Sequence, residues 1–200
     1  MNKWVKAQEW EKDWHLTQQF NSYNEETKQY MYASKMGLDE FKVNYYGQIG
    51  WDFGDKKVLD MGGSGQSILL KAKGDRTVID PIKPPKWMLE RYKAAGIKFI
   101  NQKGEEEIEG EYDIVIGMNV LQHCEDPKKI VNNILKVSKI VKWFDWIEAG
   151  LSDGHIQNLH REELEEMFGG RGRVERINRN PVVGLAWYGT FKGKLYDSDN

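Results

Sequence analysis

Short apolar runs alternate with polar, helix-forming stretches along most of the chain from residue 57 onward. The first run, Lys57–Met61, leads into a glycine-rich turn, and a later run, Arg76–Asp80, ends at an acid. Between them, Ser67–Lys71 has the pattern of a brief helix. Strand, loop, helix and strand in this order predict the first unit of an open parallel sheet. Because ligands bind at the carboxyl ends of such strands, we expect the turn and Asp80 to share one site.

The same alternation predicts the remaining strands and helices. Further strands are expected at Ile97–Asn101, from Tyr112 onward, and at Lys139–Ile147, Gly172–Asn178 and Gly184–Lys192. Further helices are expected after Pro84-Pro85, from Asp126-Pro127 with the acid as N-cap, and after His160 with Glu163 three residues on. The last two strands flank a short loop, which predicts a hairpin that closes the sheet.

The N-terminal part has a different pattern. About 20 residues carry apolar side chains at spacings of three and four, which is typical of one face of an amphipathic helix. The side chains on that face are Trp4, Ala7, Trp10 and Trp14. These aromatic residues, with Tyr23 and Tyr30 of a second expected helix, either pack an appendage onto the sheet or line a lid over a ligand. We expect residues 1–50 to form this helical lid or appendage, residues 51–193 one domain, and residues 194–200 a mobile tail.

Composition and charge exclude several classes of function. The chain has 200 residues, and its 29 Lys and Arg are outnumbered by 31 Asp and Glu without a long basic run, so a nucleic-acid partner is not expected. The single cysteine, Cys124, excludes an internal disulfide and a cysteine-based metal cluster, and we predict no metal ligands. Neither a signal peptide nor an apolar run of about 20 residues is visible. A cytoplasmic location without a membrane partner is therefore expected.

The glycine-rich turn resembles a known family motif. Val58-Leu59-Asp60-Met61-Gly62-Gly63-Ser64-Gly65 is similar to the first motif of class I S-adenosylmethionine-dependent methyltransferases, an acid followed by Gly-x-Gly. Asp80 matches the acid that binds the ribose hydroxyls in this family. Ser64 departs from the pattern, since the family more often has its second glycine there. The resemblance implies a doubly wound, mostly parallel seven-stranded sheet with a C-terminal antiparallel hairpin, and S-adenosylmethionine as cofactor.

A second stretch extends the resemblance. The run from Tyr112 to His123 is similar to the fourth strand of the family and the turn after it, and Leu121-Gln122-His123-Cys124-Glu125-Asp126-Pro127 looks like a version found in small-molecule methyltransferases of the type 11/12 group. The cofactor-binding residues that the resemblance implies are Asp60, Gly62, Gly63, Ser64, Gly65, Asp80, Glu105, Glu106, Asn119 and Val120. For Glu105 and Glu106, which stand where the family contacts adenine, a solvated acidic loop is an equal alternative.

Two histidines are candidate bases. Methyl transfer depends mainly on holding an oxygen, nitrogen or carbon nucleophile in line with the methyl group. A base adds roughly 10²–10⁴-fold where the nucleophile carries a proton of high pKa. His123 follows the fourth strand and His155 lies in the loop after the fifth, and a histidine titrates near pH 6.5. The alternatives are a turn histidine bonded to backbone for His123 and a surface residue for His155. Asp145 either positions a nucleophile or bonds a neighbouring loop.

Two other functions stay open. A nicotinamide-dependent oxidoreductase shares the fold class, but Ile68 occupies the position of the third glycine in its fingerprint. A non-catalytic S-adenosylmethionine-binding module would keep the same motifs. The interpretation that accounts for most of the chain is methyl transfer to an oxygen or nitrogen atom of a small-molecule or sugar-like acceptor.

Overall fold

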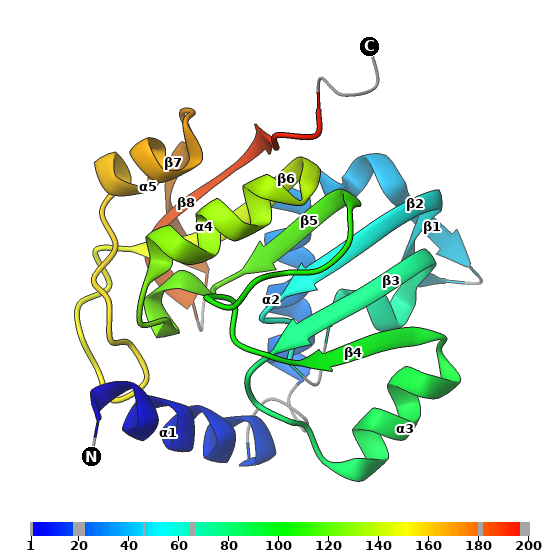
Figure 1. Cartoon of the computed structure of the whole chain (residues 1–200), viewed down its shortest axis with the longest axis horizontal. Coiled ribbons are helices and arrows are strands. Elements are labelled where there is room, and N and C mark those ends of the chain that lie inside the picture. Colours follow the sequence, from blue (N-terminus) through cyan, green and yellow to red (C-terminus); the bar gives the residue numbers. More distant parts are fainter. Residues whose placement is uncertain (1, 18–22, 46, 65–66, 180–181, 197–200) are drawn as a thin grey trace.

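A central sheet of eight strands runs through the molecule (Figure 1). The computed structural model describes residues 2–17, 23–45, 47–64, 67–179 and 182–196. The strands are β1 Lys42–Tyr45, β2 Gln48–Met61, β3 Ala72–Asp80, β4 Ile97–Asn101, β5 Tyr112–Met118, β6 Ser138–Ile147, β7 Arg173–Arg179 and β8 Val182–Lys192. The main path of the sheet has the order β4-β3-β2-β5-β6-β8-β7, and β1 pairs with β2. The strands β2, β3, β4, β5 and β6 pair in parallel with one another, whereas β8 lies antiparallel to both β6 and β7. The predicted mostly parallel sheet with a terminal antiparallel hairpin is confirmed.

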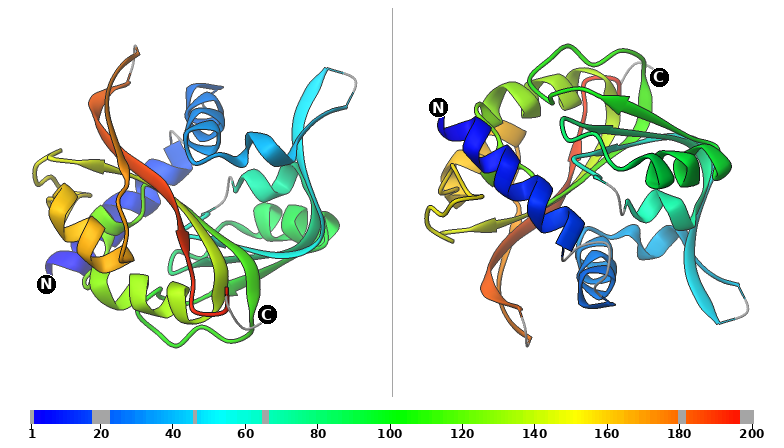
Figure 2. Two further views of the ribbon diagram at one scale, coloured as in Figure 1. Left: turned by 90° about the horizontal axis from the view of Figure 1, so that it is seen from above. Right: turned by 90° about the horizontal axis from the view of Figure 1, so that it is seen from below.

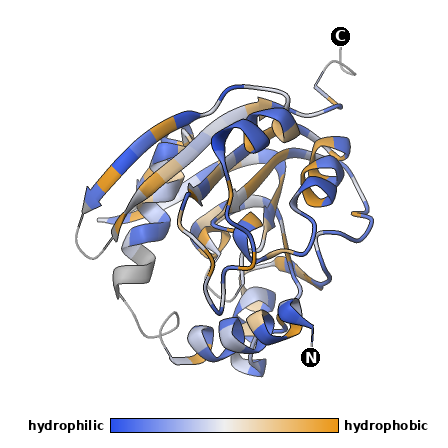
Figure 3. Ribbon diagram, turned by 90° about the vertical axis from the view of Figure 1, so that its left-hand side faces the viewer, coloured by the Kyte–Doolittle hydropathy of each residue, from blue (hydrophilic) through white to orange (hydrophobic). Residues whose placement is uncertain are grey.

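Helices cover both faces of the sheet (Figure 2). They are α1 Lys3–Thr17, α2 Tyr23–Lys35, α3 Lys86–Ala94, α4 Pro127–Lys136 and α5 Arg161–Phe168, with short 3₁₀ turns η2 Leu38–Phe41, η3 Ile68–Lys71 and η4 Leu121–His123. One buried cluster joins α2 and α3 to one face of the sheet, and a second joins α4 and α5 to the other. Figure 3 shows hydrophobic positions concentrated on the strands between these layers. The first helix, α1, instead lies across the carboxyl ends of the parallel strands (Figures 1 and 2).

Local signals account for the helix that follows β5. Asp126 Oδ1 accepts a hydrogen bond from the Lys129 N–H at 3.0 Å, and Pro127 occupies the first turn, where its missing N–H costs nothing. Ile130, Val131 and Ile134 then form a buried stripe. Both the N-cap and the stripe agree with the sequence prediction, because each depends on residues within one or two turns.

The second helix is fixed to the sheet by a buried lysine and by aromatic packing. Lys142 on β6 lies 3.4 Å and 3.3 Å from the carbonyl oxygens of Met36 and Gly37, just beyond the end of α2. Tyr32 of α2 stacks on Phe144 with ring centroids 4.2 Å apart. A polar side chain and an aromatic pair thus hold α2 at one edge of the ligand end of the sheet.

Two predicted elements differ from the structure. The strand expected at Lys57–Met61 is only the end of β2, whose first four residues pair with β1. The predicted domain boundary at residues 50/51 therefore falls inside a strand. The expected brief helix after the glycine-rich turn is a single 3₁₀ turn, η3, because Ala72 already continues into β3. None of the described helices is long and apolar enough to cross a membrane.

Candidate active site

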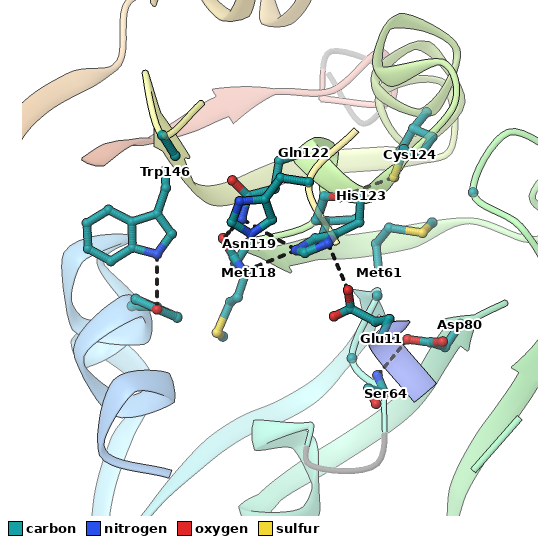
Figure 4. Close-up of a pocket in the computed structure, with 18 of the residues that line it drawn as sticks. Glu11, Met61, Ser64, Asp80, Met118, Asn119, Gln122, His123, Cys124 and Trp146 are labelled. Atoms are coloured by element: carbon teal, nitrogen blue, oxygen red, sulfur yellow. Dashed lines mark hydrogen bonds and ion pairs between the residues drawn. The ribbon is translucent and has the colours of Figure 1, made fainter. Parts of the chain in front are cut away.

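A cavity of about 640 Å³ lies at the carboxyl ends of β2, β3 and β5 (Figure 4). Its walls come from the loops after these strands, from one face of α1, from α2 and from the loop after β6. The cavity therefore occupies the edge where the sequence placed the ligand. Within the described part of the chain, no three His, Cys, Asp or Glu side chains gather as a metal site would require.

The loop after β2 has a backbone that side chains disfavour. Gly62 has a φ of 72° and Ser64 a φ of 47°, both in the left-handed region. A Cβ atom at Gly63 would lie 2.5 Å from Asp60 Oδ2, so only glycine lets the loop pass this close to the acid. Gly65, also predicted to bind the cofactor, lies outside the described residues. Asp60 accepts a 2.5 Å hydrogen bond from Ser67 Oγ, and burial raises its pKa to about 7.

Asp80 fixes the position of this loop. Its Oδ2 atom accepts the Ser64 N–H at 2.9 Å, and its Oδ1 atom accepts the Ile82 N–H at 2.7 Å (Figure 4). Burial raises the pKa of Asp80 to about 6, although both of these hydrogen bonds favour the charged form. Because a carboxylate has about four acceptor positions, Asp80 can still accept two hydroxyl groups from a ligand in the cavity.

The turn after β5 is held by the third buried aspartate. Asp145 Oδ1 accepts the backbone N–H groups of Val120 and Leu121 at 2.8 Å and 3.3 Å, and its Oδ2 accepts Trp143 Nε1–H at 2.6 Å. Asp145 is fully buried, and this burial raises its pKa to about 7. Of the two alternatives for Asp145, the structure supports the loop-bonding one. Asn119, with a φ of 63°, and Val120 line the cavity, and their contact with a cofactor stays a prediction.

His123 lies at the centre of a polar cluster. Its Nδ1 atom is 2.9 Å from the Gly154 carbonyl oxygen and 2.8 Å from Glu11 Oε2 of α1 (Figure 4). Its Nε2 atom lies 3.4 Å from the amide nitrogens of both Asn119 and Gln122. Burial opposes the charged imidazolium, but Glu11, the Gly154 carbonyl and Asp145 together outweigh it, and the pKa of His123 is raised.

His155 lies beside His123 at the wall of the cavity. The two rings meet edge to face with centroids 5.0 Å apart. Burial lowers the pKa of His155, and the nearby His123 lowers it further. The structure thus brings the two candidate bases together, in different electrostatic settings.

Helix α1 contributes polar residues that the sequence did not identify as part of the site. Gln8, Glu11 and His15 line the cavity, at spacings of three and four that place them on one side of the helix. His15 Nδ1 lies 2.8 Å from Ser64 Oγ, and His15 Nε2 lies 3.3 Å from Glu11 Oε1. The Glu-x-x-x-His spacing of Glu11 and His15 was the sequence signal that could have identified these residues. The neighbouring tryptophans instead suggested that the inner face of the helix is apolar.

The aromatic residues proposed for the lid occupy different places. Trp14 lines the cavity, whereas Trp10 is 42% exposed and packs against Gly154 from outside. Tyr30 stays outside the cavity wall, with its hydroxyl 2.5 Å from Lys71 Nζ. The side chain of Tyr23 falls outside the described part of the structure.

The two acids after β4 are placed differently. Glu105 lies at the cavity wall, and its Oε1 atom accepts the N–H groups of Glu125 and Asp126 at 3.0 Å and 3.3 Å. Glu106 is exposed and does not line the cavity. The ligand contact expected of Glu106 stays a prediction.

Comparisons with known proteins define the fold. No protein-family model and no curated protein sequence matches the chain. Among solved structures, the N-methyltransferase NodS from Bradyrhizobium japonicum WM9, in complex with S-adenosyl-L-homocysteine, matches 96% of this chain and 100% of its own, with a TM-score of 0.62 and 14% identity. Magnesium protoporphyrin IX methyltransferase ChlM from Synechocystis PCC 6803, with bound S-adenosylmethionine, matches 94% of this chain and 97% of its own, with a TM-score of 0.57 and 12% identity.

A third structure matches over a shorter range. It is the 1,6-didemethyltoxoflavin-N1-methyltransferase of Burkholderia thailandensis, with 1,6-didemethyltoxoflavin and S-adenosylhomocysteine bound. The match covers 69% of this chain and 71% of that chain, with a TM-score of 0.54 and 16% identity. At these identities the likeness is one of fold. The chain has the fold of class I S-adenosylmethionine-dependent methyltransferases, as its motifs predicted.

Proposed function

We propose that this protein is an S-adenosylmethionine-dependent methyltransferase that methylates an oxygen or nitrogen atom of a small-molecule or sugar-like acceptor. The observation that carries this proposal is the joint geometry of Asp80 and the loop at Gly62–Ser64 at the end of a methyltransferase sheet. A buried acid with remaining acceptor positions lies beside a loop whose backbone approaches the cavity closely. The structures that share the fold include three with S-adenosylmethionine or S-adenosylhomocysteine bound, which supports the same cofactor here.

The residues present fit this cofactor. In the proposal, Asp80 binds the ribose hydroxyls, while the loop Gly62–Gly65, Asp60, Asn119 and Val120 surround the methionine end. Glu105 stays at the adenine end as part of the wall, with its carboxylate engaged by backbone N–H groups. When bound, the cofactor supplies an electrophilic methyl group on a sulfonium, whose leaving group is neutral.

The chain's own contribution is orientation and exclusion of water. Helix α1 covers the cavity, and Tyr32 with Trp146 forms an aromatic wall away from the glycine-rich loop, with Trp146 Nε1 donating to the Tyr32 hydroxyl at 3.2 Å. Such walls hold a compact acceptor in place so that the transferred group needs little movement to reach it. His123 and His155 are the candidates to accept the proton that the acceptor loses.

A small acceptor is consistent with the volume of the cavity and with the slightly acidic net charge of the chain. A volume of about 640 Å³ is in the range of small-molecule pockets, and it must hold the cofactor as well. Polyanion binding usually depends on Lys and Arg, and here acidic residues outnumber basic ones by 31 to 29. We also retain a cytoplasmic location as part of the proposal.

Incubation with methyl-labelled S-adenosylmethionine and a metabolite extract, followed by mass spectrometry, tests the proposal. We expect label in a discrete small molecule, and little label in bulk DNA or RNA offered in parallel at physiological salt. Label in the polymers that falls steeply as salt rises would overturn the choice of acceptor. Cofactor binding without transfer to any pool would favour the non-catalytic module, and tight NAD binding would favour the oxidoreductase.

A further inference from the structure

We propose that Glu11 of α1 is the positioning residue for His123, so that the base of the reaction is complete only when α1 lies over the cavity. The inference rests on the proposed methyl transfer and extends it, since it assigns a function to a lid residue that the motifs do not identify. It depends on the contacts between α1, the turn after β5 and the loop after β6.

The contacts at His123 define which ring nitrogen carries the proton. Nδ1 faces the Gly154 carbonyl oxygen at 2.9 Å, which can only accept, so Nδ1 is the donor. Nε2 faces two amide nitrogens at 3.4 Å, from Asn119 and Gln122, and therefore presents its lone pair. At 3.4 Å the hydrogen bonds from these amides to the Nε2 lone pair are weak. A neutral ring with Nε2 unprotonated is the form that a general base requires.

Glu11 lies where it stabilises the charged ring. Its Oε2 atom is 2.8 Å from Nδ1 of His123, yet the geometry is that of an ion pair, because the N–H itself points at the Gly154 carbonyl. Both side chains are largely withdrawn from water, with 13% of His123 and 15% of Glu11 exposed. A carboxylate at this distance and burial favours the imidazolium that forms when Nε2 takes a proton.

Other groups on the packed elements also act on the ring. Asp145 of β6 favours the imidazolium, whereas His155 in the loop after β6 opposes it when charged. On α1, His15 contacts the opposite oxygen of Glu11 at 3.3 Å. Glu11 is the acid in direct contact with His123, so its removal should dominate the change in the ring's proton affinity.

The same helix also connects the base with the glycine-rich loop. Glu11 Oε1 contacts His15, whose Nδ1 lies 2.8 Å from Ser64 Oγ, and the Ser64 N–H is bonded to Asp80. A row of polar contacts therefore crosses the cavity from the proposed ribose acid to the proposed base. In this position of α1, Glu11 lies against His123 and His15 lies against Ser64.

In the proposed step, a methyl group moves to the acceptor while a proton leaves it. As the acceptor O–H or N–H attacks, the C–S bond breaks with its electron pair going to sulfur, the methyl group bonds to the acceptor, and the acceptor proton passes to Nε2 of His123. Glu11 then faces an imidazolium at 2.8 Å until Nε2 releases the proton to solvent. No other reactant is needed.

Histidine NMR tests the assignment without knowledge of the acceptor. The ring signals of His123 are titrated in the wild type, in Glu11→Gln, and in Glu9→Gln, which makes the same change on an exposed position of the same helix. We expect the His123 pKa to fall in E11Q and to stay unchanged in E9Q, with ¹⁵N shifts of the neutral wild-type ring showing the proton on Nδ1. An unchanged His123 titration in E11Q, or a proton on Nε2, would overturn the proposal.

Turnover on the acceptor found by labelling gives the second readout. Because a base contributes roughly 10²–10⁴-fold, E11Q should lose about tenfold or more in kcat while S-adenosylhomocysteine affinity stays within about threefold. The acidic limb of the kcat/KM profile should move to lower pH, since the base must be neutral and its pKa has dropped. Joint loss of cofactor affinity and turnover would instead make Glu11 a cofactor ligand. A wild type that binds cofactor but transfers nothing would refute the proposed function and leave the NMR result standing.

Discussion

At the residue scale, three buried aspartates near strand ends make separate sets of hydrogen bonds. Asp60 is bonded by Ser67, Asp80 by the backbone of Ser64 and Ile82, and Asp145 by the turn after β5. The sequence identified the first two from their positions after apolar runs. It left the function of Asp145 open. The hydrogen bonds of this side chain reach Val120 and Leu121, which lie 25 and 24 positions earlier in the chain, so they depend on the packing of β5 against β6.

Replacement of Asp80 tests its assignment to the ribose. Asp80→Ala should weaken S-adenosylhomocysteine binding by about 1–3 kcal/mol, the cost of losing charge-assisted hydrogen bonds, or roughly 5–150-fold in Kd. Isothermal titration calorimetry measures this directly. The matched control is Asp75→Ala, an exposed position on the same strand, which should bind as the wild type does. Equal affinity in all three proteins would remove Asp80 from the site.

At the element scale, α1 is where sequence reasoning was least complete. The strands from β3 onward, α4 and the terminal hairpin follow from local periodicity and caps, whereas β1 and the first nine residues of β2 were not predicted. The inner face of α1 carries Gln8, Glu11 and His15, so polar side chains face inward and the helix has no clear apolar stripe. In that orientation His15 contacts Ser64 and Glu11 contacts His123, and both partners are distant in sequence.

Whether α1 acts as a lid stays a prediction that hydrogen exchange can test. Its polar contacts to Ser64 and His123 meet the walls of the proposed cofactor site. Bound S-adenosylhomocysteine should therefore slow amide exchange in α1 residues 3–17, because local opening is suppressed when the ligand occupies the closed form. Helix α5, which does not line the cavity, serves as the internal reference. Protection confined to the β2 and β3 loops, with none in α1, would leave the helix as an appendage.

At the scale of the whole molecule, the buried acids set the pH dependence of stability. Burial raises the pKa of Asp60 to about 7, of Asp80 to about 6 and of Asp145 to about 7, and the pKa of His123 is raised as well. Each group binds its proton more tightly in the folded state, so its stabilising contribution is present at low pH and is lost as pH rises through the folded pKa. Glu11 has a lowered pKa and acts in the opposite direction, but only below about pH 4.5.

The urea midpoint of the apoprotein should therefore fall as pH rises from about 5 to about 8. Equilibrium unfolding followed by tryptophan fluorescence at several pH values measures it, and a constant m-value shows that the comparison is valid. A midpoint that climbs steadily over this range would mean that these carboxyl groups are not held in the buried sites described.

The central claim is that the cavity at the end of the sheet is an S-adenosylmethionine site. Calorimetric titration of the full-length protein with S-adenosylhomocysteine, and separately with NAD, tests it most directly. We expect one molecule of S-adenosylhomocysteine to bind per chain and NAD to bind far more weakly, because a single 3₁₀ turn follows the glycine-rich loop in place of a full helix N-terminus. Tight NAD binding with no heat from S-adenosylhomocysteine would contradict the account.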